Sequence, residues 1–163
     1  MTRPTVGFIG VGYIGKPMAG NVLRAGFPLV IHDLRSEPVA KLVSMGAAAA
    51  SSCAELARRC DVIITVLPSK TEVDAAVLGP DGVAEGIRQG TVLIETSTID
   101  PATVRHIATV LSERGADTLD AALMKGVPAA QAGELTIPVG GDAAVVARCR
   151  AVLESMASEI PHV

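Results

Sequence analysis

Apolar and polar residues alternate along this chain in blocks that predict strands and helices in turn. The run from Val6 to Ile9 predicts a buried strand, and Ile14, Met18 and Val22 then recur at the spacing of one helix face. Later apolar runs predict strands at residues 28–31, 47–50, 61–68, 91–95, 118–123 and 135–139, with helical patterns near 36–45, 52–59, 71–78, 101–114 and 143–156. This alternation predicts an α/β fold with a doubly wound, mostly parallel sheet.

Polar residues at the predicted helix starts support these limits. Ser36 is expected to cap the helix at 36–45, and Asp100 and Asp142 are expected to cap the last two helices. Ser52 and Glu55 form the S-x-x-E pattern of a capping box. Residues 124–133 are predicted to form a loop.

The first strand runs into the pattern Gly10-x-Gly12-x-x-Gly15, and a helix and a second strand follow it. In this context the pattern is the dinucleotide-binding fingerprint of a Rossmann fold. The first glycine permits the tight turn, the second leaves room for a pyrophosphate, and the third lets the helix pack closely on the strand. N–H groups at the helix start attract the phosphates. The candidate cofactor-binding residues of this turn are Gly10, Gly12, Tyr13, Ile14 and Gly15.

An acidic residue follows the second strand, where dinucleotide-binding domains hold the adenosine ribose. Asp33 can accept hydrogen bonds from both ribose hydroxyls of NAD and repels the 2′-phosphate of NADP. Arg35 could attract that phosphate instead. We therefore predict NAD as the cofactor and keep NADP as the alternative. His32 is either beside the adenine pocket or a partly buried strand residue.

The composition narrows the class of protein. The 163 residues suffice for one domain, and 49% hydrophobic against 19% charged residues suits a sheet that is covered on both faces. Three aromatic residues and a net charge of −3 argue against a nucleic-acid partner. Cys53, Cys60 and Cys149 lie far apart in the sequence and are expected to fill the core of a protein in a reducing compartment, without disulfides or a metal site. No stretch reaches the roughly 18 apolar residues of a membrane span, so we expect a soluble cytoplasmic protein without a membrane partner.

The ligand of a doubly wound sheet lies beyond the carboxyl ends of the strands. In the predicted topology, residues 10–15, 67–69, 96–98 and 124–133 meet there. Ser97 and Thr98 either contact the ligand or merely precede a capped helix, and their place in the crevice favours a functional role. Lys125 is a candidate contact for an anionic substrate; the alternatives are a general base and a solvated loop lysine.

Four ordered segments resemble the β-hydroxyacid dehydrogenase family, which includes 3-hydroxyisobutyrate dehydrogenases and tartronate semialdehyde reductases. The resemblance covers essentially the whole chain. Its segments are Gly7-Phe8-Ile9-Gly10-Val11-Gly12 continuing to Gly15-Lys16-Pro17-Met18-Ala19, Val66-Leu67-Pro68, Ser97-Thr98-Ile99-Asp100-Pro101, and Gly133-Glu134-Leu135-Thr136 leading to Val139-Gly140-Gly141. It implies that the backbone of Leu67 and Pro68 lies beside the adenosine, that Thr98 lies near the nicotinamide, and that Ser97 lies between cofactor and substrate.

Two departures from the family pattern concern the substrate and catalysis. A family loop that usually reads Asp-Ala-Pro-Val-Ser-Gly-Gly is here Asp120-Ala121-Ala122-Leu123-Met124-Lys125-Gly126. Met124, Lys125 and Gly126 thus stand where the family contacts the substrate carboxylate, and they favour a longer or more anionic acid. The family also continues into an all-helical domain with the catalytic lysine and the main dimer contact. We expect residues 1–163 to be the dinucleotide-binding domain alone, with the catalytic lysine beyond Val163.

The resemblance implies an NAD-dependent oxidoreductase module of a 3-hydroxyacid dehydrogenase, such as one for 3-hydroxyisobutyrate. The full-length protein would transfer hydride between a small hydroxy acid and nicotinamide and would form a homo-oligomer, whereas residues 1–163 alone would turn over little or nothing. Two alternatives remain at this point: a stand-alone dinucleotide-binding or sensing module without catalysis, and an imine reductase.

Overall fold

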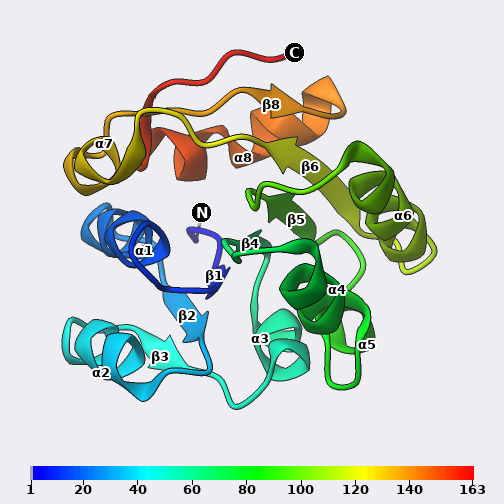
Figure 1. The fold of residues 1–163 in the computed structure, drawn as a ribbon, viewed down its shortest axis with the longest axis horizontal. Coiled ribbons are helices and arrows are strands. Elements are labelled where there is room, and N and C mark those ends of the chain that lie inside the picture. The colour runs from blue at the N-terminus through cyan, green and yellow to red at the C-terminus, as the bar shows by residue number, and fades with distance from the viewer. Residues whose placement is uncertain (1) are drawn as a thin grey trace.

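A seven-stranded sheet runs through the centre of the computed structural model, which describes residues 2–163 (Figure 1). Its strand order is β3-β2-β1-β4-β5-β6-β8, and every neighbouring pair is parallel except β6 and β8. The strands are β1 (Val6–Ile9), β2 (Leu29–His32), β3 (Ala48–Ala49), β4 (Val62–Thr65), β5 (Val92–Glu95), β6 (Asp117–Ala121) and β8 (Val139–Gly140). The predicted doubly wound, mostly parallel sheet is therefore confirmed.

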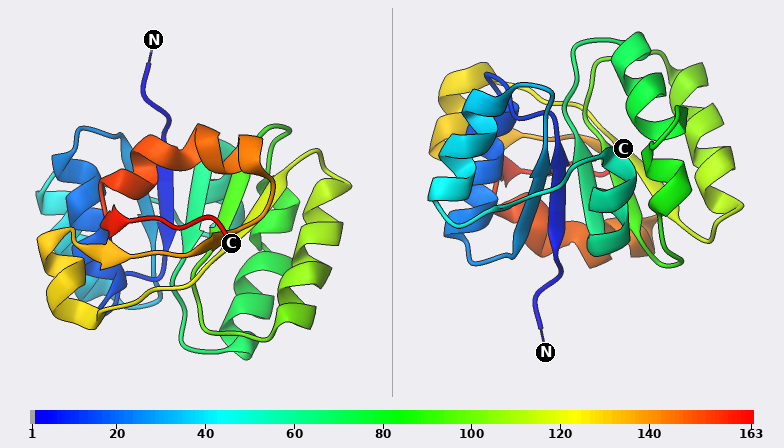
Figure 2. Two further views of the ribbon diagram at one scale, coloured as in Figure 1. Left: turned by 90° about the horizontal axis from the view of Figure 1, so that it is seen from above. Right: turned by 90° about the horizontal axis from the view of Figure 1, so that it is seen from below.

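Helices cover both faces of this sheet, as the two further views show (Figure 2). One face packs against α1 (Gly15–Arg24), α2 (Ser36–Ser44), α7 (Gly126–Ala132) and α8 (Ala143–Glu154). The other packs against α3 (Cys53–Arg59), α4 (Lys70–Leu78), α5 (Val83–Gly86) and α6 (Pro101–Ser112). Successive strand residues point to opposite faces, so that Phe8 belongs to the first core cluster and Ile9 to the second.

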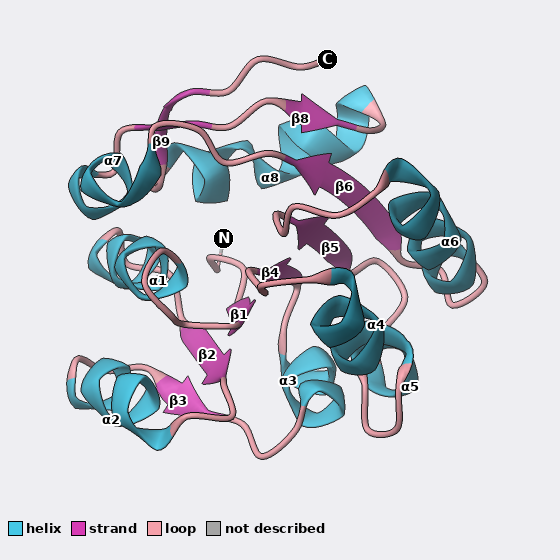
Figure 3. Cartoon of the chain, viewed as in Figure 1, coloured by secondary structure: helices cyan, strands magenta, loops and turns pink. Residues whose placement is uncertain are grey.

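The chain departs from the predicted elements mainly after β6 (Figure 3). Residues 124–133, predicted as a loop, contain α7, which begins at Gly126. The residue before the helix, Lys125, and its first residue, Gly126, both have a positive φ. The strand predicted at 135–139 is divided into β7 (Leu135–Thr136), which pairs with β9 (Ala157–Glu159), and β8, which pairs with β6. The predicted single strand is therefore shared between the seven-stranded sheet, which contains β8, and a separate two-stranded sheet, which contains β7.

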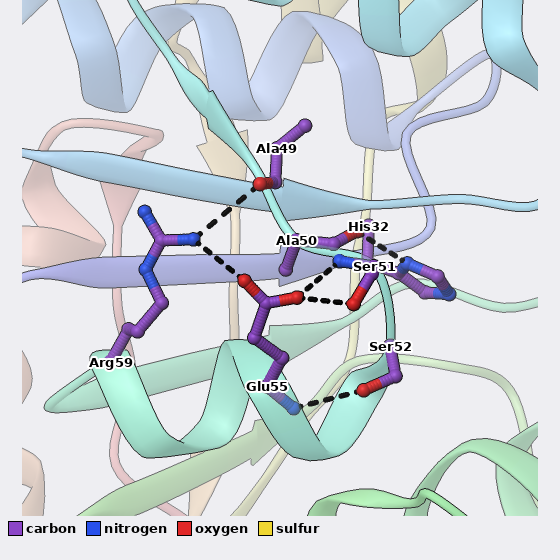
Figure 4. Close-up of polar contacts among 7 residues, drawn as sticks. All are labelled: His32, Ala49, Ala50, Ser51, Ser52, Glu55 and Arg59. Carbon is purple, nitrogen blue, oxygen red and sulfur yellow. Dashed lines mark hydrogen bonds and ion pairs between the residues drawn. The ribbon is translucent and has the colours of Figure 1, made fainter.

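The helix caps follow the predicted chemistry with two changes. The Asp100 and Asp142 carboxylates accept N–H groups of the first turns of α6 and α8, as predicted. Ser52 caps α3 by accepting the Glu55 N–H at 3.0 Å, but the Glu55 carboxylate accepts the N–H and hydroxyl of Ser51 instead of closing the box on Ser52 (Figure 4). The capping prediction for Ser36 is wrong, because this residue is already the first of α2.

The three cysteines lie in the core, as expected of apolar fillers. Burial raises the pKa of the Cys60 thiol to about 12 and those of Cys53 and Cys149 to about 11. Among the helices of residues 2–163, none combines the length and apolar character needed to cross a bilayer.

Candidate functional site

The strand order reverses between β1 and β4, because the chain passes from β1 outward to β2 and β3 and then returns to β4. In sheets of this kind the crevice at the reversal, beyond the carboxyl ends of the strands, is the usual ligand site. The loops after β1, β2, β4 and β5 meet at this edge.

The glycine turn after β1 is as tight as its pattern predicts. Gly10 has a φ of +93°, and a Cβ on it would lie 2.1 Å from the carbonyl oxygen of Val66. A Cβ on Gly15 would lie 2.3 Å from the carbonyl oxygen of Gly10. Both glycines are therefore required by close backbone approaches inside the protein.

Gly12 differs from these two glycines. A Cβ on it would approach only the Arg35 guanidinium, with Nη2 at 2.8 Å. Within residues 2–163, no protein acceptor lies within hydrogen-bond reach of the N–H groups of Gly12, Tyr13 and Ile14 at the start of α1. Free N–H groups at a helix start and an open face over a glycine fit the pyrophosphate of a dinucleotide.

Asp33 lies at the end of β2 with its carboxylate directed to the same turn. Its Oδ2 accepts the Val11 N–H at 2.9 Å, and its Oδ1 accepts the Arg35 N–H at 2.9 Å. The Arg35 side chain donates to both oxygens, at 3.2 Å from Nε and 3.1 Å from Nη2. Partial burial by itself would raise the pKa of Asp33, but these hydrogen bonds outweigh it and hold the pKa below its usual value. The carboxylate is thus ionised and able to accept sugar hydroxyls.

The Arg35 guanidinium lies over the glycine turn while it pairs with Asp33, and 59% of its side chain is exposed. It belongs to the rim of a cavity of about 870 Å³ that Gly12, Tyr13 and the α7 residues Val127 and Gln131 also line. The structure therefore brings α7 beside the glycine turn, although the two are far apart in the sequence.

The loops after β4 and β5 are joined by side-chain hydrogen bonds. The Leu67 N–H donates to the Ser97 hydroxyl oxygen at 2.9 Å. Leu67 also reaches the glycine turn, since its Cδ2 would lie 3.1 Å from a Cβ on Gly10. Pro68 and Thr98 are exposed at the same edge. The structure thus links three of the four predicted segments directly.

Glu95 is a feature of this edge that the sequence analysis missed. It is the only charged residue among residues 2–163 that is fully buried. Its Oε2 accepts the Thr65 hydroxyl at 2.5 Å, and its Oε1 accepts the Ser97 N–H at 2.6 Å. Burial raises its pKa, and hydrogen bonds from Ser97 and Thr65 offset part of that rise. An acid ending an otherwise apolar strand was the available signal.

Met124, Lys125 and Gly126 precede and begin α7 on the surface. Lys125 has a φ of +83°, an uncommon conformation for a residue with a side chain. Its Nζ lies 3.4 Å from Oε1 of Glu159 on β9. No hydrogen bond joins Met124, Lys125 or Gly126 to Ser97 or Thr98 in the described part of the chain.

His32 has a structural partner. Its Nδ1–H donates to the Ala50 carbonyl oxygen at 3.0 Å and so ties the end of β2 to the residue after β3 (Figure 4). Of the two interpretations of His32, this contact favours a partly buried strand residue over a residue beside the adenine pocket. No group of three or more metal-binding side chains gathers anywhere in residues 2–163.

Comparisons with known proteins give a consistent result. A protein-family model described as the NAD binding domain of 6-phosphogluconate dehydrogenase matches residues 5–163. An NAD-dependent L-serine dehydrogenase from Pseudomonas aeruginosa is 41% identical over 157 residues, which are 96% of this chain and 53% of that protein. The chain spans about half the length of the curated relatives that it matches.

Solved structures of nicotinamide-dependent enzymes have the same fold as this chain. The 3-hydroxyisobutyrate dehydrogenase of Mycobacterium tuberculosis, solved with L-serine, matches with a TM-score of 0.92 and 32% identity over 99% of this chain and 54% of that chain. A variant imine reductase from Myxococcus stipitatus in complex with NAD⁺ matches with a TM-score of 0.87 and 28% identity over 99% of this chain and 55% of that chain.

Proposed function

Because this chain belongs to the family of the NAD binding domain of 6-phosphogluconate dehydrogenase, we propose that it is the cofactor-binding part of a dehydrogenase for a small β-hydroxy acid. The observation that carries the proposal is the glycine turn, with three free N–H groups beside the ionised carboxylate of Asp33. The family resemblance expected from the sequence motifs is confirmed, and the chain is an NAD-binding domain.

We assign the binding of the cofactor to two groups of residues. The turn residues Gly10, Gly12, Tyr13, Ile14 and Gly15 would hold the pyrophosphate through backbone N–H groups and close approach. Asp33 would accept the ribose hydroxyls once Arg35 moves aside, and the exposed edge at Leu67, Pro68 and Thr98 would flank the rest of the dinucleotide. The bound nicotinamide supplies or accepts the hydride. The protein contributes orientation and charge.

The substrate would be a small β-hydroxy acid, and Met124 and Lys125 would favour one that is longer or more anionic than the family's usual substrate. Ser97 lies where cofactor and substrate would meet, and Met124, Lys125 and Gly126 would contact the substrate from the start of α7. The ammonium of Lys125 has one exposed partner, Glu159, which a substrate carboxylate could replace at small cost because exposed ion pairs contribute only about 0–1 kcal/mol.

A further part of the proposal concerns catalysis and assembly, which we assign to residues outside this domain. We assign the catalytic lysine to residues beyond Val163 and treat residues 1–163 as the dinucleotide-binding domain, as the family pattern implies. The full-length protein would form a homo-oligomer through that further part. The three buried free thiols favour the reducing cytoplasm.

Calorimetric titration of the purified chain with NADH and NADPH tests the cofactor assignment. We expect NADH to bind more tightly than NADPH, and Asp33→Ala to weaken NADH binding at least tenfold. A matched control is Asp117→Ala, which removes an ion-paired carboxylate from the opposite end of the sheet. Failure of the chain to bind either nucleotide would overturn the proposal.

The substrate class is tested by assaying the longest protein that contains this chain. We expect it to oxidise short β-hydroxy acids with NAD⁺ and expect Lys125→Ala to raise KM more than it lowers kcat. The imine-reductase alternative rests on structural matches to complexes with NAD⁺ and with NADP⁺, and it predicts reduction of an imine instead. Binding of nucleotide without turnover of either class would favour a sensing module.

A further inference from the structure

The buried carboxylate of Glu95 stands between the two loops that would flank the nicotinamide. It ends β5, where the register pairs it with Thr65 of β4 on one side and Asp120 of β6 on the other. Its exposed fraction is 0%, so its carboxylate contacts only protein. A carboxylate in such a place requires hydrogen-bond donors, because a buried charge without them is costly.

Those donors come from both neighbouring strand ends. The Thr65 hydroxyl lies on one carboxylate oxygen and the Ser97 N–H on the other, at 2.5 Å and 2.6 Å. Ser97 in turn accepts the Leu67 N–H with its hydroxyl oxygen at 2.9 Å. A continuous line of contacts therefore runs from the end of β4 through Glu95 and Ser97 back to the loop after β4.

This line settles the orientation of Ser97. Its N–H donates to Glu95, and its hydroxyl oxygen accepts the Leu67 N–H, so the protein holds Ser97 by its backbone and by its side chain. The following residue, Thr98, is exposed at the crevice. A shift of Ser97 would therefore carry Thr98 with it, because the two share a peptide plane.

An apolar side chain of similar size could fill the space of Glu95. It would leave the Thr65 hydroxyl and the Ser97 N–H without their partner in the protein interior, which is unfavourable for each group. Packing alone therefore does not explain an acid here. What the acid adds is a bridge between two loops, and both loops belong to the candidate site.

We propose that Glu95 is a positioning residue that fixes Ser97 and Thr98 for the nicotinamide half of the dinucleotide. The proposal rests on the dinucleotide-binding function proposed above. Glu95 itself does not reach the crevice and acts through Ser97. The adenosine half depends on the glycine turn and Asp33, whose own contacts do not involve Glu95.

The charged group that acts on Glu95 is also an acid. The Asp120 carboxyl faces it from β6, and it raises the pKa of Glu95 further, after the larger effect of burial. Burial also raises the pKa of Asp120.

A pair of ligands distinguishes the two halves. NADH carries the nicotinamide, whereas ADP-ribose keeps the adenosine, the pyrophosphate and a ribose but lacks that ring. For Glu95→Ala we expect NADH affinity to fall at least fivefold and ADP-ribose affinity to stay within twofold. Glu95→Gln, which keeps one acceptor oxygen for Ser97, should restore most of the NADH affinity.

Two control variants separate a loss of positioning from a loss of stability. Val92→Ala truncates a buried residue at the other end of β5 and should lower stability without changing the ratio of the two affinities. Thr65→Val removes one donor and preserves shape, and it should change the ratio in the same direction as Glu95→Ala if the latter fails to fold. Equal weakening of both ligands, or no change in either, would overturn the positioning role. If the wild-type chain binds neither ligand, the proposed function itself is wrong.

Discussion

Replacing Gly12 with Ala should weaken cofactor binding and leave the fold intact. A Cβ at this position would lie 2.8 Å from Nη2 of Arg35 and 3.7 Å from the next guanidinium atoms, which end a flexible and exposed side chain. The φ of Gly12 is not positive, so an L-residue fits its backbone. A Gly-to-Ala change at such a site also restricts the unfolded chain. We expect the free energy of unfolding to change by less than about 1 kcal/mol.

The same replacement at Gly15 should damage the fold. The new Cβ would lie 2.3 Å from the carbonyl oxygen of Gly10, which is backbone and cannot swing away. Helix α1 would have to move off β1. Overpacking of this kind costs about 1–3 kcal/mol.

The loss of affinity at Gly12 follows from the free N–H groups around it. A methyl group over the turn would hold a phosphate away from at least one of them. A hydrogen bond to a charged group contributes about 1.5–3 kcal/mol, which corresponds to roughly a tenfold to hundredfold weaker Kd. Arg35 would also be displaced from its position over the turn, and this would weaken its exposed side-chain pairing with Asp33.

Urea denaturation and calorimetric titration with NADH measure the two effects separately. Gly20→Ala is the matched control, since its Cβ would touch only the Arg24 guanidinium, at 3.4 Å, farther along α1. It should stabilise the helix by up to about 1 kcal/mol and leave the Kd unchanged. The reasoning is refuted if Gly12→Ala binds NADH like the wild type, or if Gly15→Ala is as stable as Gly12→Ala.

Three further predictions concern other parts of the chain. Arg35→Ala should increase the preference for NADH over NADPH severalfold, because it frees Asp33 and removes the cation nearest to a 2′-phosphate; titration of both nucleotides measures this, and an unchanged ratio would contradict it. The pKa of Asp33 lies below its usual value in the folded chain, so its contribution to stability is present at neutral pH and is lost as the pH falls through that lowered pKa. The stability advantage over Asp33→Asn should therefore shrink between pH 7 and pH 3 in urea titrations, and a constant difference would refute the linkage. Ser52→Ala should lower the free energy of unfolding by about 1 kcal/mol through loss of the cap on α3, while an unchanged midpoint in urea would show that the cap contributes nothing.

Features with a local cause could be predicted from the sequence. The glycine turn was one, because its three positions, the strand before it and the helix after it lie within one short segment. Asp100 and Asp142 were others, since a side chain that caps a helix reaches only its own first turn. The alternation of apolar runs with helical patterns was enough for the doubly wound sheet.

Features that depend on distant partners needed the tertiary structure. Residues 124–133 carry small residues and a proline that predict a loop, yet they form α7, which packs beside α1 through the Asn21 amide and the Ala130 carbonyl oxygen at 2.7 Å. The strand after it divides because β9, at the end of the chain, pairs with one half and β6 pairs with the other. Pairings across such separations are invisible to local periodicity.

The candidate site divides in the same way. Asp33 and the glycine turn could be named from the sequence, since a dinucleotide-binding domain holds them at a known spacing. The closure of Arg35 over Gly12 and the burial of Glu95 among three strand ends arise only when β2, β4, β5 and β6 assemble. The sequence by itself determined the candidate residues for binding a dinucleotide, because they lie within one short segment. The packing of the sheet decided that Glu95 is buried between the ends of β4 and β6, because strand pairing depends on residues far apart in the sequence.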